Sequence, residues 1–160
     1  MRVGEIMNQS VVTVHEDATL EEIAQIMLDH HVWGLPVVND LGKMTGIITD
    51  ADFAVKEARI PFSRIRAPQL FGNWIGKEQI EKLYESARTL KARDVMSSPV
   101  VAVTQDEPID KVIQIMVSRG IKRIPVVRGA VPVGIVARND FLKLMARKLA
   151  EPEELSGAAE

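Results

Sequence analysis

The sequence predicts a mixed α/β (α+β) fold in which a unit of strand, helix, strand, strand and helix occurs twice along the chain. Three observations predict this fold. The chain aligns with itself when Met7 is placed on Met96. Each copy combines short β-branched runs with a stretch whose apolar residues have helical spacing. Each copy then ends in an apolar strand that runs directly into a second helix.

The internal repeat extends over the whole of each copy. The segments that match are Val11-Val12 with Val100-Val101, Gln25-Ile26-Met27 with Gln114-Ile115-Met116, Pro36-Val37-Val38 with Pro125-Val126-Val127 and, after a one-residue deletion, Asp52-Phe53 with Asp140-Phe141. A unit of roughly fifty residues is too small to bury a good core by itself. We therefore expect the two copies to pack against each other.

Each copy is predicted to begin with a strand and a helix. Residues 11–14 and 100–103 are β-branched runs that are typical of strands. The stretch that follows each run has apolar residues at i, i+3, i+4 and i+7, which predicts a helix. In copy one this helix begins at a capping box made by Thr19 and Glu22, and in copy two it begins at Pro108.

A hairpin and a second helix complete each copy. The hairpin strands are predicted at 35–38 and 44–49 in copy one and at 124–127 and 133–137 in copy two. The first strand of each hairpin carries a proline near its start, where no ladder donor is needed. Each return strand runs into a helix that starts near Asp50 or Arg138.

The chain is expected to have four segments. They are repeat 1 at 1–59, an insert and linker helix at 60–91, repeat 2 at 92–150 and a flexible tail at 151–160. The insert has no counterpart in either copy. Its prolines and apolar residues predict an irregular segment that packs against the protein, and helical spacing follows from Glu78 onward.

Composition and charge argue against several classes of protein. The chain has 20 basic and 22 acidic residues and a formal net charge of −2, so we expect no nucleic-acid and no membrane partner. It contains no apolar run long enough to span a membrane and no cysteine, and its first residues lack the charged-then-apolar pattern expected of a signal peptide. We therefore expect a cytoplasmic protein without disulfides or zinc-thiolate sites.

The junction between the return strand and the second helix carries the chemistry. In copy one it reads glycine, two apolar residues, a hydroxyl, two variable residues and an aspartate, from Gly46 to Asp52. The glycine lets a ligand or a neighbouring backbone come close. Thr49 offers a hydroxyl at a helix N-terminus, where free amides favour phosphate. Asp52 can accept two hydrogen bonds from a ribose diol.

This motif, placed after a Pro-Val-Val strand and repeated downstream, resembles the cystathionine-β-synthase (CBS) domain family. The resemblance covers both copies and implies that they form a CBS domain pair, or Bateman module, which is a pseudo-twofold unit with ligand clefts between the repeats. It implies a regulatory sensor of an adenine nucleotide (AMP, ADP or ATP) or a related adenosyl ligand. Such a sensor acts on a partner protein by conformational change.

The resemblance also implies binding roles for particular residues. Asp52 would bind the ribose, and Thr49 would contact the ribose or a phosphate. In copy one the residues that would wall the adenine pocket are Val11, Val12, Thr13, Gly34, Leu35 and Pro36. In copy two the ligand-binding candidates are Val100, Val101, Arg123, Ile124, Pro125, Arg138 and Asp140.

The two clefts are expected to differ. Copy two has Ala137 where copy one has Thr49, and the neighbouring Arg138 could replace a neutral phosphate donor with a charge. Arg119 and Lys122 add further positive charge to copy two, together with Arg123. The residues at the equivalent positions of copy one are His30, His31, Trp33 and Gly34.

The same motif residues also allow purely structural roles. Gly46 and Gly134 could serve only tight strand packing, and Asp52 and Asp140 could be ordinary first-turn helix acids. Asp50 and Asp52 form a DxD pair that could hold magnesium in a small phosphotransferase. No third carboxylate and no phosphate-cradling loop accompanies this pair, so we expect no metal site.

The main alternative to a sensor is a ligand-free dimerisation or assembly module. Modules of the resembled family commonly associate into disk-like dimers through their helices, so the resemblance also implies a homodimer. The sequence contains no identifiable set of nucleophile, base and oxyanion donors, so we expect neither an enzyme nor a catalytic residue. We expect no required cofactor beyond a bound adenine nucleotide.

Overall fold

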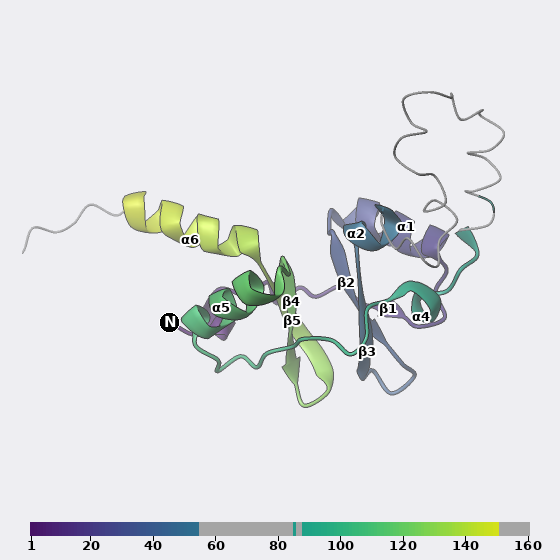
Figure 1. Ribbon diagram of the computed structural model, residues 1–160, viewed down its shortest axis with the longest axis horizontal. Helices are drawn as coiled ribbons and strands as arrows, with labels where there is room; N and C mark the ends of the chain where they lie inside the picture. Colours follow the sequence, from purple (N-terminus) through teal and green to yellow (C-terminus); the bar gives the residue numbers. More distant parts are fainter. Residues whose placement is uncertain (55–84, 86–87, 151–160) are drawn as a thin grey trace, which may run out of the picture. The chain divides into compact units, whose positions relative to one another are not determined.

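The computed structural model describes residues 1–54, 85 and 88–150 (Figure 1). The expected insert at 60–77 and the tail at 151–160 lie outside the described residues, as does most of the predicted linker helix. Within the described part, both copies of the predicted unit are present and the mixed α+β fold is confirmed.

Copy one begins with the 3-10 helix η1. Its elements are η1 (Val3–Glu5), β1 (Val14–His15), α1 (Leu20–His30), β2 (Gly34–Val38), β3 (Met44–Thr49) and α2 (Asp50–Ala54). Copy two has the same order except that its first strand is reduced to an isolated bridge. Its elements are α4 (Ala92–Val95), α5 (Ile109–Arg119), β4 (Arg123–Arg128), β5 (Val131–Ala137) and α6 (Arg138–Ala150).

The first strand of each copy is shorter than predicted. In copy one only Val14 and His15 pair with β2, and in copy two the segment makes a single bridge from Val103 to Val126. The residue that pairs is also the one buried in a core, Val14 at 4% exposure in copy one and Val103 at 5% in copy two. The residues before them do not continue the ladder.

Helix α1 has the predicted start and a well-defined end. Glu22 N–H donates to Thr19 Oγ1 at 3.3 Å, and Thr19 N–H donates to Glu22 Oε2 at 2.8 Å, so the predicted capping box is confirmed. His31 ends the helix in the left-handed conformation with a φ of 51°. Helix α5 begins after Pro108 and ends at Gly120, whose φ is 65°.

Strands β1, β2 and β3 form one sheet, in which β1 is parallel and β3 antiparallel to β2. Asn39 shapes the turn between β2 and β3, because its Oδ1 accepts the N–H groups of Leu41 and Lys43 at 3.0 and 3.1 Å. Strands β4 and β5 form a second, two-stranded sheet. Each return strand then runs directly into a helix, β3 into α2 and β5 into α6.

The segment that leads into each copy does not pack with the rest of that copy. Ala92 N–H donates to Ala18 O at 2.8 Å, and the matched bond in the other half joins Val3 N–H to Glu107 O at 3.0 Å. A second matched pair joins Arg93 N–H to Glu16 O at 3.0 Å and Gly4 N–H to Gln105 O at 2.9 Å. The two lead segments are therefore exchanged between the copies.

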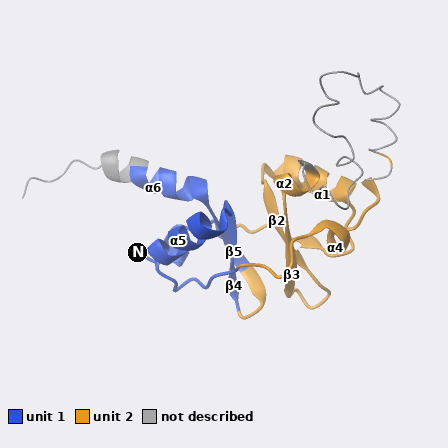
Figure 2. Cartoon of the chain, viewed as in Figure 1, with its two compact units in different colours: residues 1–9, 102–128, 133–160 blue, residues 10–101, 129–132 orange. Residues whose placement is uncertain are grey.

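The exchange defines two compact units that differ from the sequence repeats (Figure 2). Unit 1 comprises residues 1–9, 102–128 and 133–160, and unit 2 comprises residues 10–101 and 129–132. Each unit has its own hydrophobic core. Copy two contributes Ala92 and Val95 to the core of unit 2, and copy one contributes Val3 and Met7 to the core of unit 1.

Candidate functional site

The predicted junction of copy one lies where the start of β2 meets the end of β3. Gly34 lies opposite Thr49 in the ladder between these strands. Asp50 N–H donates to the carbonyl oxygen of Trp33 at 3.2 Å, just beyond the last ladder pair. The structure therefore places two predicted site residues, Gly34 and Thr49, next to each other in unit 2.

Asp52 is the only polar or charged residue among those described as buried, with 4% exposure. Its Oδ2 accepts the backbone N–H of Thr49 at 2.7 Å and the Thr49 hydroxyl at 3.1 Å. The N–H bond is the one that an acid at the third helical position makes in a capping box. Asp52 therefore starts helix α2 and at the same time orients the hydroxyl that the sequence singles out.

Asp140 makes the same backbone bond in copy two. Its Oδ2 accepts the N–H of Ala137 at 2.8 Å, and Lys143 Nζ lies 3.4 Å from its Oδ1. The Asp140 side chain is 17% exposed. The first-turn role suggested for both aspartates is therefore present in the structure. A carboxylate has about four acceptor positions, so the bonds of this first-turn role do not use all of its acceptor capacity.

The same backbone hydrogen bond occurs in both junctions, so their residues can be matched position by position. Arg138 N–H donates to Lys122 O at 2.9 Å, as Asp50 N–H donates to Trp33 O in copy one. Trp33 is 51% exposed, and Asp50, Lys122 and Arg138 are also exposed. The side chains at equivalent places thus differ in charge. Sequence reasoning named the basic residues, but the carbonyl partners became evident only in the structure.

In each motif, a methionine of an exchanged lead segment fills the space beside the glycine Cα. A methyl group built on Gly46 would lie against Met96, 2.7 Å from its Cγ and 3.0 Å from its Cβ. A methyl group on Gly134 would lie 2.7 Å from Met7 Sδ and 3.0 Å from the Asn8 carbonyl oxygen. Strand packing is therefore the role that the structure gives to both glycines.

Backbone bridges accompany these two contacts. Ile47 and Ser97 exchange N–H to carbonyl bonds of 3.1 and 2.9 Å, and Asn8 and Ile135 exchange bonds of 3.0 and 3.1 Å. Each return strand thus pairs with the lead segment that its own compact unit acquires from the other copy. Sequence reasoning named Ile47 and Ile135 as part of the motif but did not find their partners Ser97 and Asn8, which come from the other repeat.

The residues predicted to wall the adenine pocket have different exposures. Val11 and Val12 are half-buried and Thr13 is exposed. Gly34, Leu35 and Pro36 are buried, and in copy two so are Ile124 and Pro125. Leu35 and Ile124 belong to the two hydrophobic cores at 0% exposure, so only their backbone groups could meet a ligand.

The predicted set of copy two is divided between the compact units. Val100 and Val101 are half-buried members of unit 2. Arg123, Ile124, Pro125, Arg138 and Asp140 belong to unit 1. The copy-one set, in contrast, lies entirely within unit 2.

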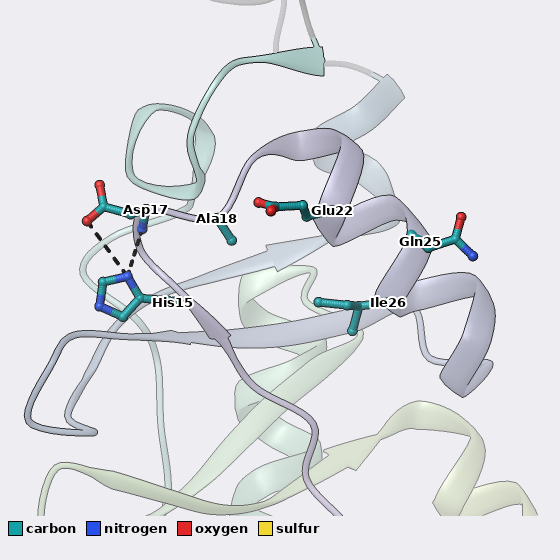
Figure 3. A pocket seen from close by; sticks show the side chains of 6 residues that line it. All are labelled: His15, Asp17, Ala18, Glu22, Gln25 and Ile26. Atoms are coloured by element: carbon teal, nitrogen blue, oxygen red, sulfur yellow. Dashed lines mark hydrogen bonds and ion pairs between the residues drawn. The ribbon is translucent and has the colours of Figure 1, made fainter.

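An open pocket of about 630 Å³ lies beside the start of α1 in unit 2 (Figure 3). It is lined by His15, Asp17, Ala18, Glu22, Gln25 and Ile26. None of these is a predicted site residue. The two acidic side chains of this pocket, Asp17 and Glu22, already have hydrogen-bond partners within the protein.

The polar groups at this pocket hold the lead segment of copy two. Lys91 Nζ lies 2.9 Å from Asp17 Oδ1, and Arg93 also contacts this oxygen. The hydrogen bond from Lys91 keeps the pKa of Asp17 below its ordinary value of 3.8. Nearby, His15 Nε2 lies 2.9 Å from Asp40 Oδ1. The hydrogen bond from the Thr19 backbone lowers the pKa of Glu22.

Residues 1–54, 85 and 88–150 contain no group of three or more histidine, aspartate or glutamate side chains that could hold a metal ion. No helix in this part of the chain is long and apolar enough to cross a membrane.

Comparison with protein families gives one match that covers both copies. The family model described as "CBS domain" matches residues 3–57 and 92–147. The matched ranges correspond to the two sequence repeats, including their exchanged lead segments.

Several relatives have names that state no function. "Uncharacterized protein MJ1426" of Methanocaldococcus jannaschii is 31% identical, and the match covers 91% of each chain. "Uncharacterized protein MK0525" of Methanopyrus kandleri is 30% identical over 95% of this chain and 66% of its own length. The chain spans only 42% of a third relative, "Uncharacterized protein MJ1225" of M. jannaschii.

Solved structures similar to this chain also contain CBS domains. The CBS domain of a CBS domain-containing membrane protein from Sphaerobacter thermophilus is 40% identical, has a TM-score of 0.71 and covers 90% of this chain and 87% of its own. The CBS domain pair of protein MJ0100, solved in complex with 5-methylthioadenosine and S-adenosyl-L-methionine, is 26% identical with a TM-score of 0.68. That match covers 92% of this chain and 98% of the other.

Proposed function

Because the chain belongs to the CBS domain family, we propose that it is a regulatory module of the cytoplasm that binds an adenosine-containing ligand and acts on a partner protein by conformational change. The observation that carries this proposal is the pair formed by Thr49 and Asp52. A buried carboxylate holds a hydroxyl at the end of a strand, 3.1 Å away, and the matching aspartate recurs in copy two. The MJ0100 domain pair, with its two adenosyl ligands, supports the ligand class.

The proposed chemistry at this junction uses hydrogen bonds to the ribose. A ribose presents two adjacent hydroxyl donors, which suit the acceptor oxygens of a carboxylate that is fixed in place. Asp52 is fixed by its bond of 2.7 Å to the Thr49 backbone. Such preorganisation lowers the ordering cost that a ligand has to overcome on binding. Thr49 adds a hydroxyl that can donate or accept.

The proposed contacts to the adenine base come from the backbone. Gly34, Leu35 and Pro36 are buried, so their side chains present little surface to a ligand. Backbone N–H and carbonyl groups can still read the edge of a base. For copy two, Ile124 and Pro125 have the same place and burial. Regulation follows only if the ligand binds one conformation of the protein more tightly than another.

A second candidate function is an assembly module that dimerises without a ligand. It is favoured by exposed apolar side chains on two helices of unit 1. On α5, Ile113 and Val117 are 41% and 72% exposed, and on α6, Leu142 and Met145 are 60% and 63% exposed. Spacings of three and four residues place each pair on one helix face. Both functions can coexist in a homodimeric sensor.

Calorimetric titration with S-adenosylmethionine, 5-methylthioadenosine, AMP and ATP tests the sensor. Binding of at least one of them is expected, and a variant with Asp52→Ala and Asp140→Ala should lose it at least about tenfold. Asp52→Asn is the control for folding, because its amide oxygen can still accept the Thr49 N–H. Full affinity in the double alanine variant would overturn the residue assignment, and no binding of any ligand to the unmodified protein would overturn the sensor.

Sedimentation of the ligand-free protein tests the assembly module. We expect a dimer that becomes a monomer when Val117, at 72% exposure, is changed to glutamate. A monomer in the unmodified protein at all concentrations would contradict this second function.

A further inference from the structure

The open pocket of unit 2, beside the start of α1, combines an apolar wall with a carboxylate. Ala18 and Ile26, which line it, are half-buried and pack against the core of this unit. Figure 3 shows Glu22 and Ile26 pointing to the same side of α1, while Gln25 points away. The volume of about 630 Å³ is ample for one long side chain. The pocket therefore offers apolar contact and a negative charge side by side.

Glu22 keeps acceptor capacity after its structural bonds are made. Its Oε2 accepts the Thr19 N–H at 2.8 Å and the Thr19 hydroxyl at 3.0 Å. Both bonds use the same oxygen, so Oε1 is left as an acceptor. The hydrogen bond from the Thr19 backbone holds the pKa of Glu22 below its ordinary value of 4.5, so the side chain is ionised at neutral pH. Within the described residues, no lysine or arginine forms an ion pair with it.

Asp17, the other acid of the pocket, already has its cations. Lys91 Nζ lies 2.9 Å from Asp17 Oδ1, and Arg93 contacts the same oxygen. These two cations belong to the lead segment of copy two, which they attach to unit 2. The carboxylate that remains without a cation in this pocket is therefore that of Glu22.

The matched positions of copy two show which group complements such a carboxylate. The repeat places Ala18 on Glu107 and Glu22 on Lys111. Lys111 Nζ lies 2.8 Å from Glu107 Oε2, so an ammonium and a carboxylate meet at the start of α5. In copy one the lysine is replaced by a glutamate, and the small side chain of Ala18 leaves room beside it. Copy one therefore has a carboxylate at this place and lacks the ammonium.

We propose that this pocket is a docking site for a lysine side chain of a partner protein, whose ammonium pairs with Glu22 and whose methylene groups lie on Ala18 and Ile26. Lysine suits both features, because its stem covers apolar surface while its charged head stays close to water. The proposal goes beyond the binding of an adenosyl ligand, since it assigns the face of unit 2 that the partner contacts. The site lies directly beside Asp17, which attaches the lead segment of copy two.

Heteronuclear NMR with a lysine probe tests the docking site. Nα-acetyl-lysine-N-methylamide should shift the amide resonances of Glu22 and Ile26 in a saturable way, and the same probe acetylated on Nε should not, because it has no charge. Glu22→Gln should weaken the lysine probe at least about threefold. A glutamine can still form the capping box with Thr19, so this variant keeps the start of α1. Lys111→Gln in copy two is the matched control and should leave binding unchanged.

A second variant fills the pocket from within. Ala18→Glu combined with Glu22→Lys gives copy one the ion pair of copy two, and it should abolish the saturable shifts. Thermal unfolding of each variant checks that the fold is kept. Adenosyl ligands should bind both variants as they bind the unmodified protein, so failure of this site and failure of the proposed function are distinguishable.

Four results would overturn the docking site. They are the absence of a saturable shift, equal shifts with the charged and the neutral probe, unchanged affinity in both variants, and saturation by spermidine but not by the lysine probe, which would indicate a free polyamine. A change in oligomeric state of the double variant in sedimentation would instead identify a second copy of this chain as the occupant and exclude a separate partner. Raising the salt concentration should weaken the lysine probe, because an exposed ion pair is screened.

Discussion

At the scale of single residues, each motif position has a structural partner that constrains what it can do chemically. Asp52 is held by the Thr49 backbone and hydroxyl, and Gly46 is covered by Met96. The aspartate can bind a ligand without leaving its helix, because a carboxylate accepts several hydrogen bonds. The glycine has a different role, since its open face is filled by a side chain of the exchanged segment.

Gly46→Ala tests the packing role of the motif glycine. The new methyl group would lie 2.7 Å from Met96 Cγ, so we expect a loss of about 1–3 kcal/mol in the free energy of unfolding. The variant combined with Met96→Ala should lose less than the sum of the two single changes, because the clash is relieved. Gly4→Ala is the control, since its methyl group would have 3.4 Å to the nearest atom.

Chemical denaturation of these variants gives the measurement. An alanine at Gly46 that leaves the unfolding midpoint unchanged would mean that Met96 does not fill this position in solution.

At the scale of elements, the local features of a helix can be predicted from the sequence, but the exchange of lead segments between the copies cannot. The Thr19–Glu22 capping box and the helical spacing of α1 were predicted from residues three and four apart, and both are present. The pairing of Gly46 with Met96 could not be predicted in this way. Both copies contain the same glycine and methionine, so Met7 fits Gly46 and Gly134 equally well in the sequence.

Ion pairs at the pocket of unit 2 attach the lead segment of copy two. The pKa of Asp17 is lowered, chiefly by the hydrogen bond from Lys91, and that of Glu22 is lowered by its bonds with Thr19. A lowered folded-state pKa stabilises the protein above the unfolded-state pKa, and this stabilisation is lost as the pH falls through the folded-state value. We therefore expect stability to decline as the pH falls below about 4.

Asp17→Asn tests this attachment. The variant should have a lower Tm than the unmodified protein at pH 7 and a shallower decline of Tm in acid, because a group that titrates on unfolding is gone. Thermal unfolding followed by circular dichroism between about pH 3 and 7 measures both effects. Asp106→Asn, at the matched position of copy two, is the control. Parallel curves for Asp17→Asn and the unmodified protein would rule out the proposed contribution of Asp17.

At the scale of the whole molecule, packing units and sequence repeats have different boundaries. The repeat, the fold class and the family were predictable because the matches recur in order along the chain. The compact units were not, since residues 1–9 join copy two and residues 92–101 join copy one. For the same reason, the predicted site set of copy two, which contains Val100 and Arg123, falls in two units.

Two matched core variants test the exchange. Val3 has 0% exposure in the core of unit 1, and Val95 has 2% in the core of unit 2. Val3→Ala should speed amide hydrogen exchange in α5, β4 and β5, and Val95→Ala should do so in α1, β2 and β3. Each change should cost about 1–3 kcal/mol of stability. Faster exchange of α1, β2 and β3 in Val3→Ala would instead assign each lead segment to its own copy.

Ligand binding at the junction that contains Thr49 and Asp52 is the central property proposed for this protein. The Thr49 N–H, bonded to Asp52 at 2.7 Å, reports directly on this carboxylate. We expect that titration of the unmodified protein with S-adenosylmethionine shifts the Thr49 amide resonance in a saturable way in heteronuclear NMR spectra. No saturable shift of this resonance with S-adenosylmethionine, 5-methylthioadenosine, AMP or ATP would contradict the account.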